Sequence, residues 1–392
     1  MSQLTADSCS GLSNLCITQA RLPGYQGLQR LWLDHQGQVQ AIQSMEAYPF
    51  GEPGQILDVA GDWLSLGGVD LQINGALGLA FTDLAPEHEE MLLKICQFLW
   101  EQGIDGFLPT LVTTSVAKIQ QALATLKKFS HPAAQPMAQN LGAHLEGPFL
   151  NPQKRGAHPL QYLLPLTVEQ VNQVLADYAP QVKLITLAPE LDSTGAAIAQ
   201  LRSQGIIISL GHSLATAAQA QQAFAQGASL VTHAFNAMPG LHHREPGLLG
   251  AAILNPKVWC GLIADGQHIN PMMIDLLLRA TGNQGGVFLV SDALAPLGLP
   301  DGIYPWDARQ IEVKNGTAQL SDGTLAGTTV SLLTGVQNLV RWGVCSVETA
   351  IALATEAPRK ALGMAGLAPG QPARHLLRWH QDSTGELYWQ RF

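Results

Sequence analysis

The chain has 392 residues, of which 46% are hydrophobic and 13% are charged. This composition is typical of a compact globular protein and excludes an intrinsically disordered chain. The formal net charge of −9 argues against a protein that binds nucleic acid or an anionic membrane surface.

One unit recurs from about residue 66 to residue 300: a short apolar run, a polar or Gly/Pro-rich break, and a helical stretch. The apolar runs are 68–73, 104–112, 141–146, 182–188, 205–210, 228–233, 258–264 and 286–291. The helical stretches are 86–102, 115–129, 167–178, 194–204, 214–226 and 271–281, with Ser115, Thr167 and Ser213 at capping positions. Apolar strands that alternate with helices favour a parallel sheet covered by helices. Eight such strands close a (β/α)8 barrel, and a doubly wound open sheet is the alternative.

The flanking segments have a different pattern. Residues 14–60 resemble short β segments with turns, and residues 374–392 resemble a hairpin. Residues 309–325 form another predicted hairpin, with Asn315-Gly316 as its turn signal. We therefore predict an α/β fold: a TIM-like (β/α)8 barrel in residues 64–365 and a small β-sandwich domain from both chain termini. That domain comprises residues 1–63 and 366–392, with the 309–325 hairpin packed nearby.

The five cysteines are scattered along the chain and include no C-x-x-C pair. This spacing excludes a zinc finger and indicates reduced thiols. The N-terminus shows no basic segment followed by an apolar run, and no apolar stretch approaches membrane-spanning length. We therefore expect a soluble, cytoplasmic protein without a membrane partner.

Polar and ionisable residues stand where most of the predicted strands end. These residues are Gln72, Asn74, Glu146, His212, His233 and Asp292. The carboxyl ends of barrel strands meet at one mouth, where barrel enzymes place their active sites. Two histidines and a carboxylate there match a catalytic zinc site that keeps one position open for water. A cation at this site would explain why a carboxylate, Glu146, stands at the end of a predicted buried strand, since an unpaired buried carboxylate is costly.

Each of these residues also has a simpler interpretation. A single histidine at a strand end is commonly a hydrogen-bonded structural residue, and Asp292 alone could cap the following helix. Their joint occurrence at corresponding places in separate βα units favours the metal site. Asp292 is then the natural general base and later the general acid.

Several motifs carry a family resemblance from about residue 60 to residue 365. They are GVDLQINGALG, GAHLEGPFLNPQKRGAHP, LGHSLA, VTHAFNAMPGLHHREPGLLGA, IADGQHI, LVSDALAPLG and LAGTTVSL. In this order they resemble the N-acetylglucosamine-6-phosphate deacetylase family of the amidohydrolase superfamily. The resemblance implies metal-dependent hydrolysis of N-acetyl-D-glucosamine 6-phosphate to D-glucosamine 6-phosphate and acetate. It is weakest in the terminal β domain, where Arg374 takes the place of the family's usual aspartate.

The resemblance also implies a role for individual residues. The implied metal ligands are Glu146, His212 and His233, with Asp292 as proton carrier and His158 as the group that polarises the amide carbonyl. The implied substrate-binding residues are Asn236, Ala237, Arg244, His268, Leu325, Ala326 and Gly327. Arg244 lies in a Gly/Pro-rich loop, and by resemblance to the family's dimers it would reach a neighbouring subunit's pocket. A homodimer is therefore expected.

The number of metal ions follows from two further positions. Many amidohydrolases hold a second ion with His-x-His on strand one and a lysine at the end of strand four. This chain has Gln72-Ile73-Asn74 on strand one and no lysine at the end of strand four, and amides are weak ligands beside imidazole. We predict one divalent ion per subunit, zinc first and iron, cobalt or manganese as alternatives, with Gln72 bonding the metal water.

Two other functions remain as alternatives. The substrate could be a related N-acetylhexosamine phosphate, since the stereochemistry of a hydroxyl is recognised by pocket contacts that a sequence does not display. The chain could also be a non-catalytic binding protein on the same fold, because fold alone does not establish function.

Overall fold

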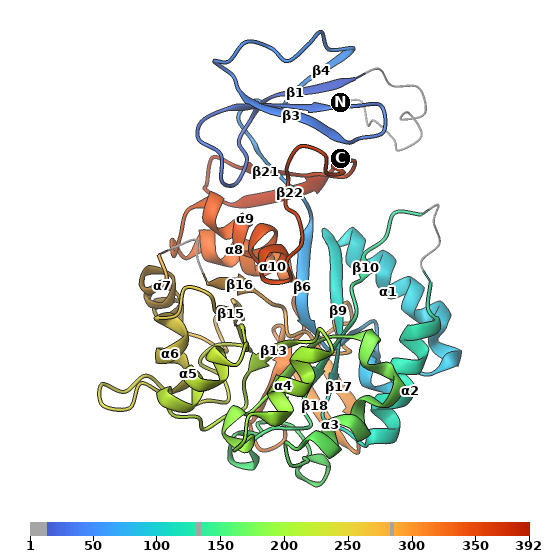
Figure 1. Ribbon diagram of the computed structural model, residues 1–392. Coiled ribbons are helices and arrows are strands. Elements are labelled where there is room, and N and C mark those ends of the chain that lie inside the picture. Colours follow the sequence, from blue (N-terminus) through green and yellow to red (C-terminus); the bar gives the residue numbers. More distant parts are fainter. Residues whose placement is uncertain (1–13, 131–134, 283–285) are drawn as a thin grey trace.

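The computed structural model describes residues 14–130, 135–282 and 286–392 (Figure 1). Its central sheet closes into a parallel barrel surrounded by helices, which confirms the predicted fold class. The barrel strands are β6 (Gly68–Ile73), β9 (Ile104–Val112), β11 (Ala143–Glu146), β12 (Val182–Leu187), β13 (Ile207–Leu210), β14 (Leu230–Val231), β15 (Trp259–Leu262) and β16 (Val287–Leu289). The ninth strand of the sheet, β10 (Gln139–Asn140), directly precedes β11 and pairs with β9.

Each predicted apolar run contains one barrel strand, and each predicted helical stretch contains one α-helix. The helices that follow barrel strands are α1 (Glu89–Glu101), α2 (Val116–Lys128), α3 (Val168–Leu175), α4 (Ala196–Ser203), α5 (Ala217–Ala225), α6 (Gly247–Ile253), α7 (Pro271–Ala280), α8 (Leu332–Arg341), α9 (Val347–Ala354) and α10 (Glu356–Ala361). Ser115 caps α2 as predicted. The prediction of Ser213 as a cap is wrong, because α5 begins after Thr216, whose side chain accepts the Gln219 N–H.

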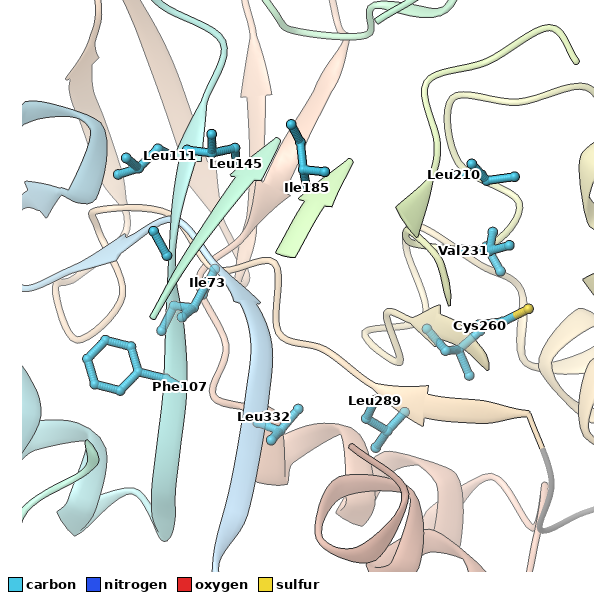
Figure 2. Close-up of a cluster of buried hydrophobic side chains, with 14 of the residues drawn as sticks. Ile73, Phe107, Leu111, Leu145, Ile185, Leu210, Val231, Cys260, Leu289 and Leu332 are labelled. Carbon is cyan, nitrogen blue, oxygen red and sulfur yellow. The ribbon is translucent and has the colours of Figure 1, made fainter. Parts of the chain in front are cut away.

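The barrel wall is apolar on both faces over most of its height. Side chains such as Phe107, Ile185 and Leu210, labelled in Figure 2, belong to the cluster that packs the strands against the outer helices. Leu108 and Leu184 belong instead to the core cluster inside the barrel. Alternate residues of a strand point to opposite faces, so each strand serves both cores.

A polar layer lies directly beyond the inner apolar cluster. Thr186 Oγ1 lies 2.7 Å from Thr232 Oγ1 and 2.7 Å from His144 Nε2. Thr110 Oγ1 lies 3.3 Å from the other ring nitrogen of His144. Burial lowers the pKa of His144 to about 4, so this histidine is neutral and structural. The layer forms the floor of the barrel mouth, because Glu146 follows His144 on the same face of β11.

The barrel closes between β16 and β6 without a regular ladder. An isolated parallel bridge joins Ile73 to Ala293, the Asp292 N–H donates to Gln72 O (2.8 Å), and the Asn74 N–H donates to Ala293 O (2.7 Å). The Asp70 side chain adds hydrogen bonds to this junction between β6 and the residues that follow β16. Its Oδ1 accepts the N–H groups of Gln72 (3.3 Å) and Ser291 (3.2 Å). The closure of the barrel therefore depends on the fully buried carboxyl group of Asp70, close to Gln72 and Asp292.

Replacing Asp70 with asparagine should change how stability depends on pH. Burial raises the pKa of Asp70 to about 7 although hydrogen bonds from Ser291 and Gln72 favour the anion. A raised pKa in the folded state means that stability is fully present below the unfolded-state pKa and is lost as pH rises through about 7. The amide oxygen of the D70N variant can still accept both N–H groups. Because an amide does not ionise, the variant does not lose stability as pH rises through this range. The melting temperature of D70N minus that of the wild type should therefore increase from about pH 5 to about pH 8. A difference that is flat across this range would show that Asp70 is ionised throughout.

The terminal segments form two further sheets next to the amino-terminal end of the barrel (Figure 1). One contains β1 (Leu15–Ala20), β2 (Gln29–Leu33), β3 (Val39–Ser44) and β4 (Gln55–Asp58), and the other contains β5 (Trp63–Ser65), β21 (Leu377–Gln381) and β22 (Leu387–Arg391). Ile17 and Leu31 of the first sheet share a core with Leu64 and Leu376. Trp379 of the second sheet packs into the barrel's outer core. Both chain ends thus contribute to this small β unit, as the sequence predicts.

The predicted hairpin at 309–325 belongs to a larger antiparallel sheet. Its strands are β17 (Gly302–Trp306), β18 (Arg309–Lys314), β19 (Thr317–Leu320) and β20 (Leu325–Thr328), with Asn315 and Gly316 at positive φ in the turn. The expected position beside the terminal domain is wrong. Thr328 donates its N–H to Asp292 O (3.0 Å), and Arg309 Nη2 donates to Ala157 O (2.8 Å). These bonds place the sheet at the barrel mouth, at the opposite end of the molecule from β1 and β3 (Figure 1).

Among the described residues, no helix has both the length and the apolar character needed to cross a membrane.

Candidate metal and catalytic site

Three predicted ligands converge at the barrel mouth. Glu146 is the last residue of β11, and His212 and His233 each stand two residues beyond the ends of β13 and β14. Glu146 Oε1 lies 3.3 Å from His212 Nε2 and 3.1 Å from His233 Nε2, and the two Nε2 atoms are 3.0 Å apart. All three residues are buried. The three ligand atoms therefore surround one small volume.

The chemistry of these atoms fits a divalent cation. His212 Nδ1 lies 2.9 Å from Lys154 O, and a carbonyl oxygen can only accept. In the neutral ring the proton is therefore on Nδ1, and the lone pair of Nε2 faces Glu146. Burial raises the pKa of Glu146, but the neighbouring His212 and His233 outweigh it and hold that pKa well below its usual value, so Glu146 is an anion. A lone pair directed at a carboxylate anion is repulsive unless a cation lies between them, and one carboxylate with two imidazoles is a known catalytic zinc ligand set.

The backbone is unusual at two of the three ligands and at Asp292. His212, His233 and Asp292 have positive φ values of 49°, 25° and 48°. Residues other than glycine rarely adopt this region, and such strain concentrates at functional sites. Each residue closely follows a barrel strand, where the sharp turn keeps its side chain over the mouth.

Asp292 lies beside the three ligands and is held by two amides. Gln72 Nε2 donates to Asp292 Oδ1 (3.1 Å) and to Glu146 Oε1 (2.8 Å), and Asn74 Nδ2 donates to Asp292 Oδ1 (2.7 Å). Burial and the negative charge of Glu146 raise the pKa of Asp292 to about 7, while His233, Asn74 and His268 oppose the rise. A carboxyl group with this pKa can both take up and release a proton near neutral pH. The sequence places Asn74 among the polar residues at the barrel mouth but assigns it no role, although its alternation with Gln72 puts both side chains on one strand face.

His158 points its Nε2 toward the same centre, 4.0 Å from Glu146 Oε2. Its Nδ1 lies 3.3 Å from the Thr113 backbone N and 2.9 Å from Thr113 Oγ1. Because a backbone N–H can only donate, Nδ1 is an acceptor and the proton is on Nε2. Burial and the neighbouring His212 ring lower the pKa of His158 to about 3. His158 is therefore a neutral hydrogen-bond donor, the opposite tautomer to His212.

The predicted sugar-phosphate residues lie around this centre, with one exception. Asn236 and Ala237 form a turn after His233, in which the Asn236 N–H donates to His233 O (3.0 Å). His268 Nδ1 lies 2.7 Å from Asp265 Oδ2, so Asp265, which was not predicted, fixes the ring. Arg244 is the exception: it lies in an exposed loop, where its Nη1 contacts His243 Nε2 at 2.9 Å.

Leu325, Ala326 and Gly327 are in β20, next to Asp292. A Cβ at Gly327, where φ is +142°, would lie 2.6 Å from Asp292 O. Glycine is therefore required at this position, because any side chain would displace the backbone of Asp292. The β17–β20 sheet thus packs directly against Asp292.

Comparison with known proteins identifies the family. The chain is 35% identical over 332 residues to N-acetylglucosamine-6-phosphate deacetylase of Vibrio furnissii, covering 85% of this chain and 81% of the relative. The chain belongs to the N-acetylglucosamine-6-phosphate deacetylase family. It is also 34% identical over 309 residues to N-acetylgalactosamine-6-phosphate deacetylase of Escherichia coli O157:H7, covering 78% of this chain and 80% of that protein. No family model matches the chain.

Solved structures agree with the deacetylase assignment. The crystal structure of N-acetylglucosamine-6-phosphate deacetylase from Pasteurella multocida aligns with 97% of this chain at a TM-score of 0.80 and 27% identity, over 100% of that chain. The structure from Thermotoga maritima aligns at a TM-score of 0.77 and 27% identity, covering 96% of each chain. An enamidase of the amidohydrolase superfamily shares the fold at a TM-score of 0.57 and 15% identity, over 95% of this chain and 88% of its own.

Proposed function

We propose that the chain hydrolyses the acetamide bond of N-acetyl-D-glucosamine 6-phosphate and releases D-glucosamine 6-phosphate and acetate. The observation that carries the proposal is the convergence of Glu146, His212 and His233 on one volume beside Asp292. The names of the relatives in Vibrio furnissii and Pasteurella multocida support the same substrate.

The reaction needs an activated water, a polarised carbonyl and an acid for the leaving amine. A divalent cation held by Glu146, His212 and His233 would supply an acidified water and Lewis acidity toward the acetyl carbonyl. Asp292 takes a proton from the water as the new C–O bond forms. His158 donates its Nε2–H to the carbonyl oxygen. Asp292 then gives its proton to the nitrogen as the C–N bond breaks. The immediate products are acetic acid and an amine, and transfer of the acid proton to the amine gives acetate and an ammonium group.

The cation we propose is a single zinc ion per subunit, with iron, cobalt or manganese as alternatives. Gln72 stands where a second ion would need an imidazole, and it donates to Glu146 and Asp292. An amide that donates with its nitrogen cannot ligate a metal through that atom. Lys183 is the second residue of β12, far along the strand from the mouth, so no lysine bridges two ions there.

The phosphate is assigned to Asn236, Ala237 and His268, because a side-chain amide, a backbone N–H group and an imidazole N–H can each donate a hydrogen bond to a phosphate oxygen. A chain with a net charge of −9 needs such local donors to hold an anion. We further propose a homodimer in which Arg244, exposed in one copy, contacts the phosphate held by the other. Light scattering should give the mass of two chains, and a monomer mass at assay concentration would contradict this arrangement.

A panel of substrates tests the proposal against its main alternative, N-acetylgalactosamine 6-phosphate, which the similar identity to the Escherichia coli relative keeps open. Acetate release should favour the glucosamine derivative by about 10-fold or more in kcat/KM, because a misplaced hydroxyl leaves buried polar groups unpaired. N-Acetylglucosamine without phosphate should be a much poorer substrate. Preference for the galactosamine derivative would reassign the substrate, and no acetate from any of them would indicate a binding protein.

A further inference from the structure

Glu190 joins three loops at the barrel mouth. It follows β12 in the short 3-10 helix Pro189–Leu191. Its Oε2 accepts the Ser213 Oγ–H (2.6 Å), and its Oε1 accepts the Leu214 N–H (2.6 Å) and an N–H of Asn151 Nδ2 (2.9 Å). Asn151 lies after β11, and Ser213 and Leu214 lie after β13. One half-buried carboxylate therefore connects the loops after three successive strands.

These bonds flank the predicted metal ligand His212. The strained backbone of His212 accepts the Asn151 N–H at its carbonyl oxygen (2.9 Å), and Gly211 donates its N–H to Leu187 O (3.1 Å). Glu190 bonds to Ser213 and Leu214, the two residues that follow His212. It also bonds to the side chain of Asn151, whose backbone N–H donates to the carbonyl oxygen of His212. A positive φ at a non-glycine residue persists only where the surrounding contacts enforce it. Glu190 supplies three of those contacts.

The same loop reaches the turn assigned to the sugar phosphate. The Ser213 N–H donates to Ala237 O (3.1 Å), and Lys154 Nζ donates to Met238 O (3.4 Å). Lys154 also accepts the Nδ1–H of His212 at its own carbonyl oxygen (2.9 Å). A continuous set of hydrogen bonds thus runs from Glu190 past the metal ligand to the substrate turn.

We propose that Glu190 is a positioning residue that holds His212 in its metal-binding conformation and couples the metal centre to the Asn236–Ala237 turn. The second part rests on the proposed function, and the first does not. The role needs acceptor atoms rather than charge, since all three partners are donors. Glutamine can keep the bonds from Leu214 and Asn151 through its amide oxygen, and the Ser213 hydroxyl can rotate to accept from the amide nitrogen. Alanine leaves all three donors without this acceptor.

Metal affinity is the direct test, and it needs no substrate. Apoenzyme of the wild type, E190A and E190Q is titrated with Zn²⁺ against a competing chelator. E190A should bind Zn²⁺ about 10- to 100-fold more weakly, as is usual when the support of a metal ligand is removed, and E190Q should remain close to the wild type. With the metal saturating, E190A should also show a raised KM, which E190Q should not.

Asp192 offers a matched control in the same loop. Its carboxylate accepts the N–H groups of Gly195 (2.9 Å) and Ile198 (2.9 Å) at the start of α4, away from His212. D192A should lower the melting temperature without weakening Zn²⁺ binding. S213A removes a single bond to Glu190 and provides a milder variant should E190A fail to fold; it should show a smaller loss of affinity in the same direction.

Unchanged Zn²⁺ affinity in folded E190A, or in S213A where E190A does not fold, would overturn the proposal. A loss in E190Q as large as that in E190A would also overturn it. Normal Zn²⁺ binding by the wild type without any acetate release would instead refute the proposed function and leave the affinity test of Glu190 valid.

Discussion

Replacing Asp292 with asparagine should lower kcat for deacetylation by about 1000-fold or more while the metal content of the protein stays the same. The amide oxygen of the D292N variant can still accept the two N–H groups of Gln72 and Asn74, so the site should keep its shape. The amide cannot take a proton from water or give one to the leaving amine. Acetate release and metal analysis on the same preparation measure both quantities.

The D292N result also separates catalysis from metal binding. Retention of more than about a tenth of the wild-type kcat would show that another group carries the proton, because general acid–base catalysis contributes far more than this factor. Loss of the metal together with activity would show that Asp292 is itself a ligand.

The second large effect concerns the histidines. His233→Gln should remove most of the bound metal and nearly all activity, because two protein ligands cannot replace three at a buried site. His158→Gln should retain the metal and still lose most of its turnover. The reason is that the Thr113 N–H places the His158 proton on Nε2, where it can donate to a carbonyl but cannot ligate a cation.

Metal analysis of these two variants distinguishes the assignments. The two histidines belong to one cluster, since the rings of His158 and His212 are 4.5 Å apart and those of His212 and His233 are 4.8 Å apart. A general disturbance of the cluster would therefore lower metal content in both variants. Metal loss in H158Q equal to that in H233Q would contradict the opposite roles given to the two rings.

The sequence was sufficient to predict the barrel and the centre of its site. Parallel strands buried on both faces are continuous apolar runs, and their ends are marked by the polar residues that follow. Glu146, His212, His233 and Asp292 could thus be placed at one mouth before their distances were known. The capping residues Ser115 and Thr167 could also be predicted, because the side chain of a capping residue accepts an N–H from the first turn of its own helix.

Features that depend on contacts between distant segments were not predictable. Asn315-Gly316 identifies a hairpin, but the packing of that hairpin on Asp292 depends on Thr328 and Arg309, which bond to other loops. Ser213 resembles a helix cap in sequence, yet its hydroxyl donates to Glu190 in the structure. Glu190 itself carries no local signal, since its three partners come from two other loops.

The central claim is that one divalent ion, held by Glu146, His212 and His233, makes this chain a deacetylase. Titration of the apoenzyme with Zn²⁺ during acetate release from N-acetyl-D-glucosamine 6-phosphate tests it most directly. Activity should be absent at the start, rise in proportion to added Zn²⁺ and stop rising at one ion per chain. Full activity of the apoenzyme, or a rise that continues to two ions per chain, would contradict the account.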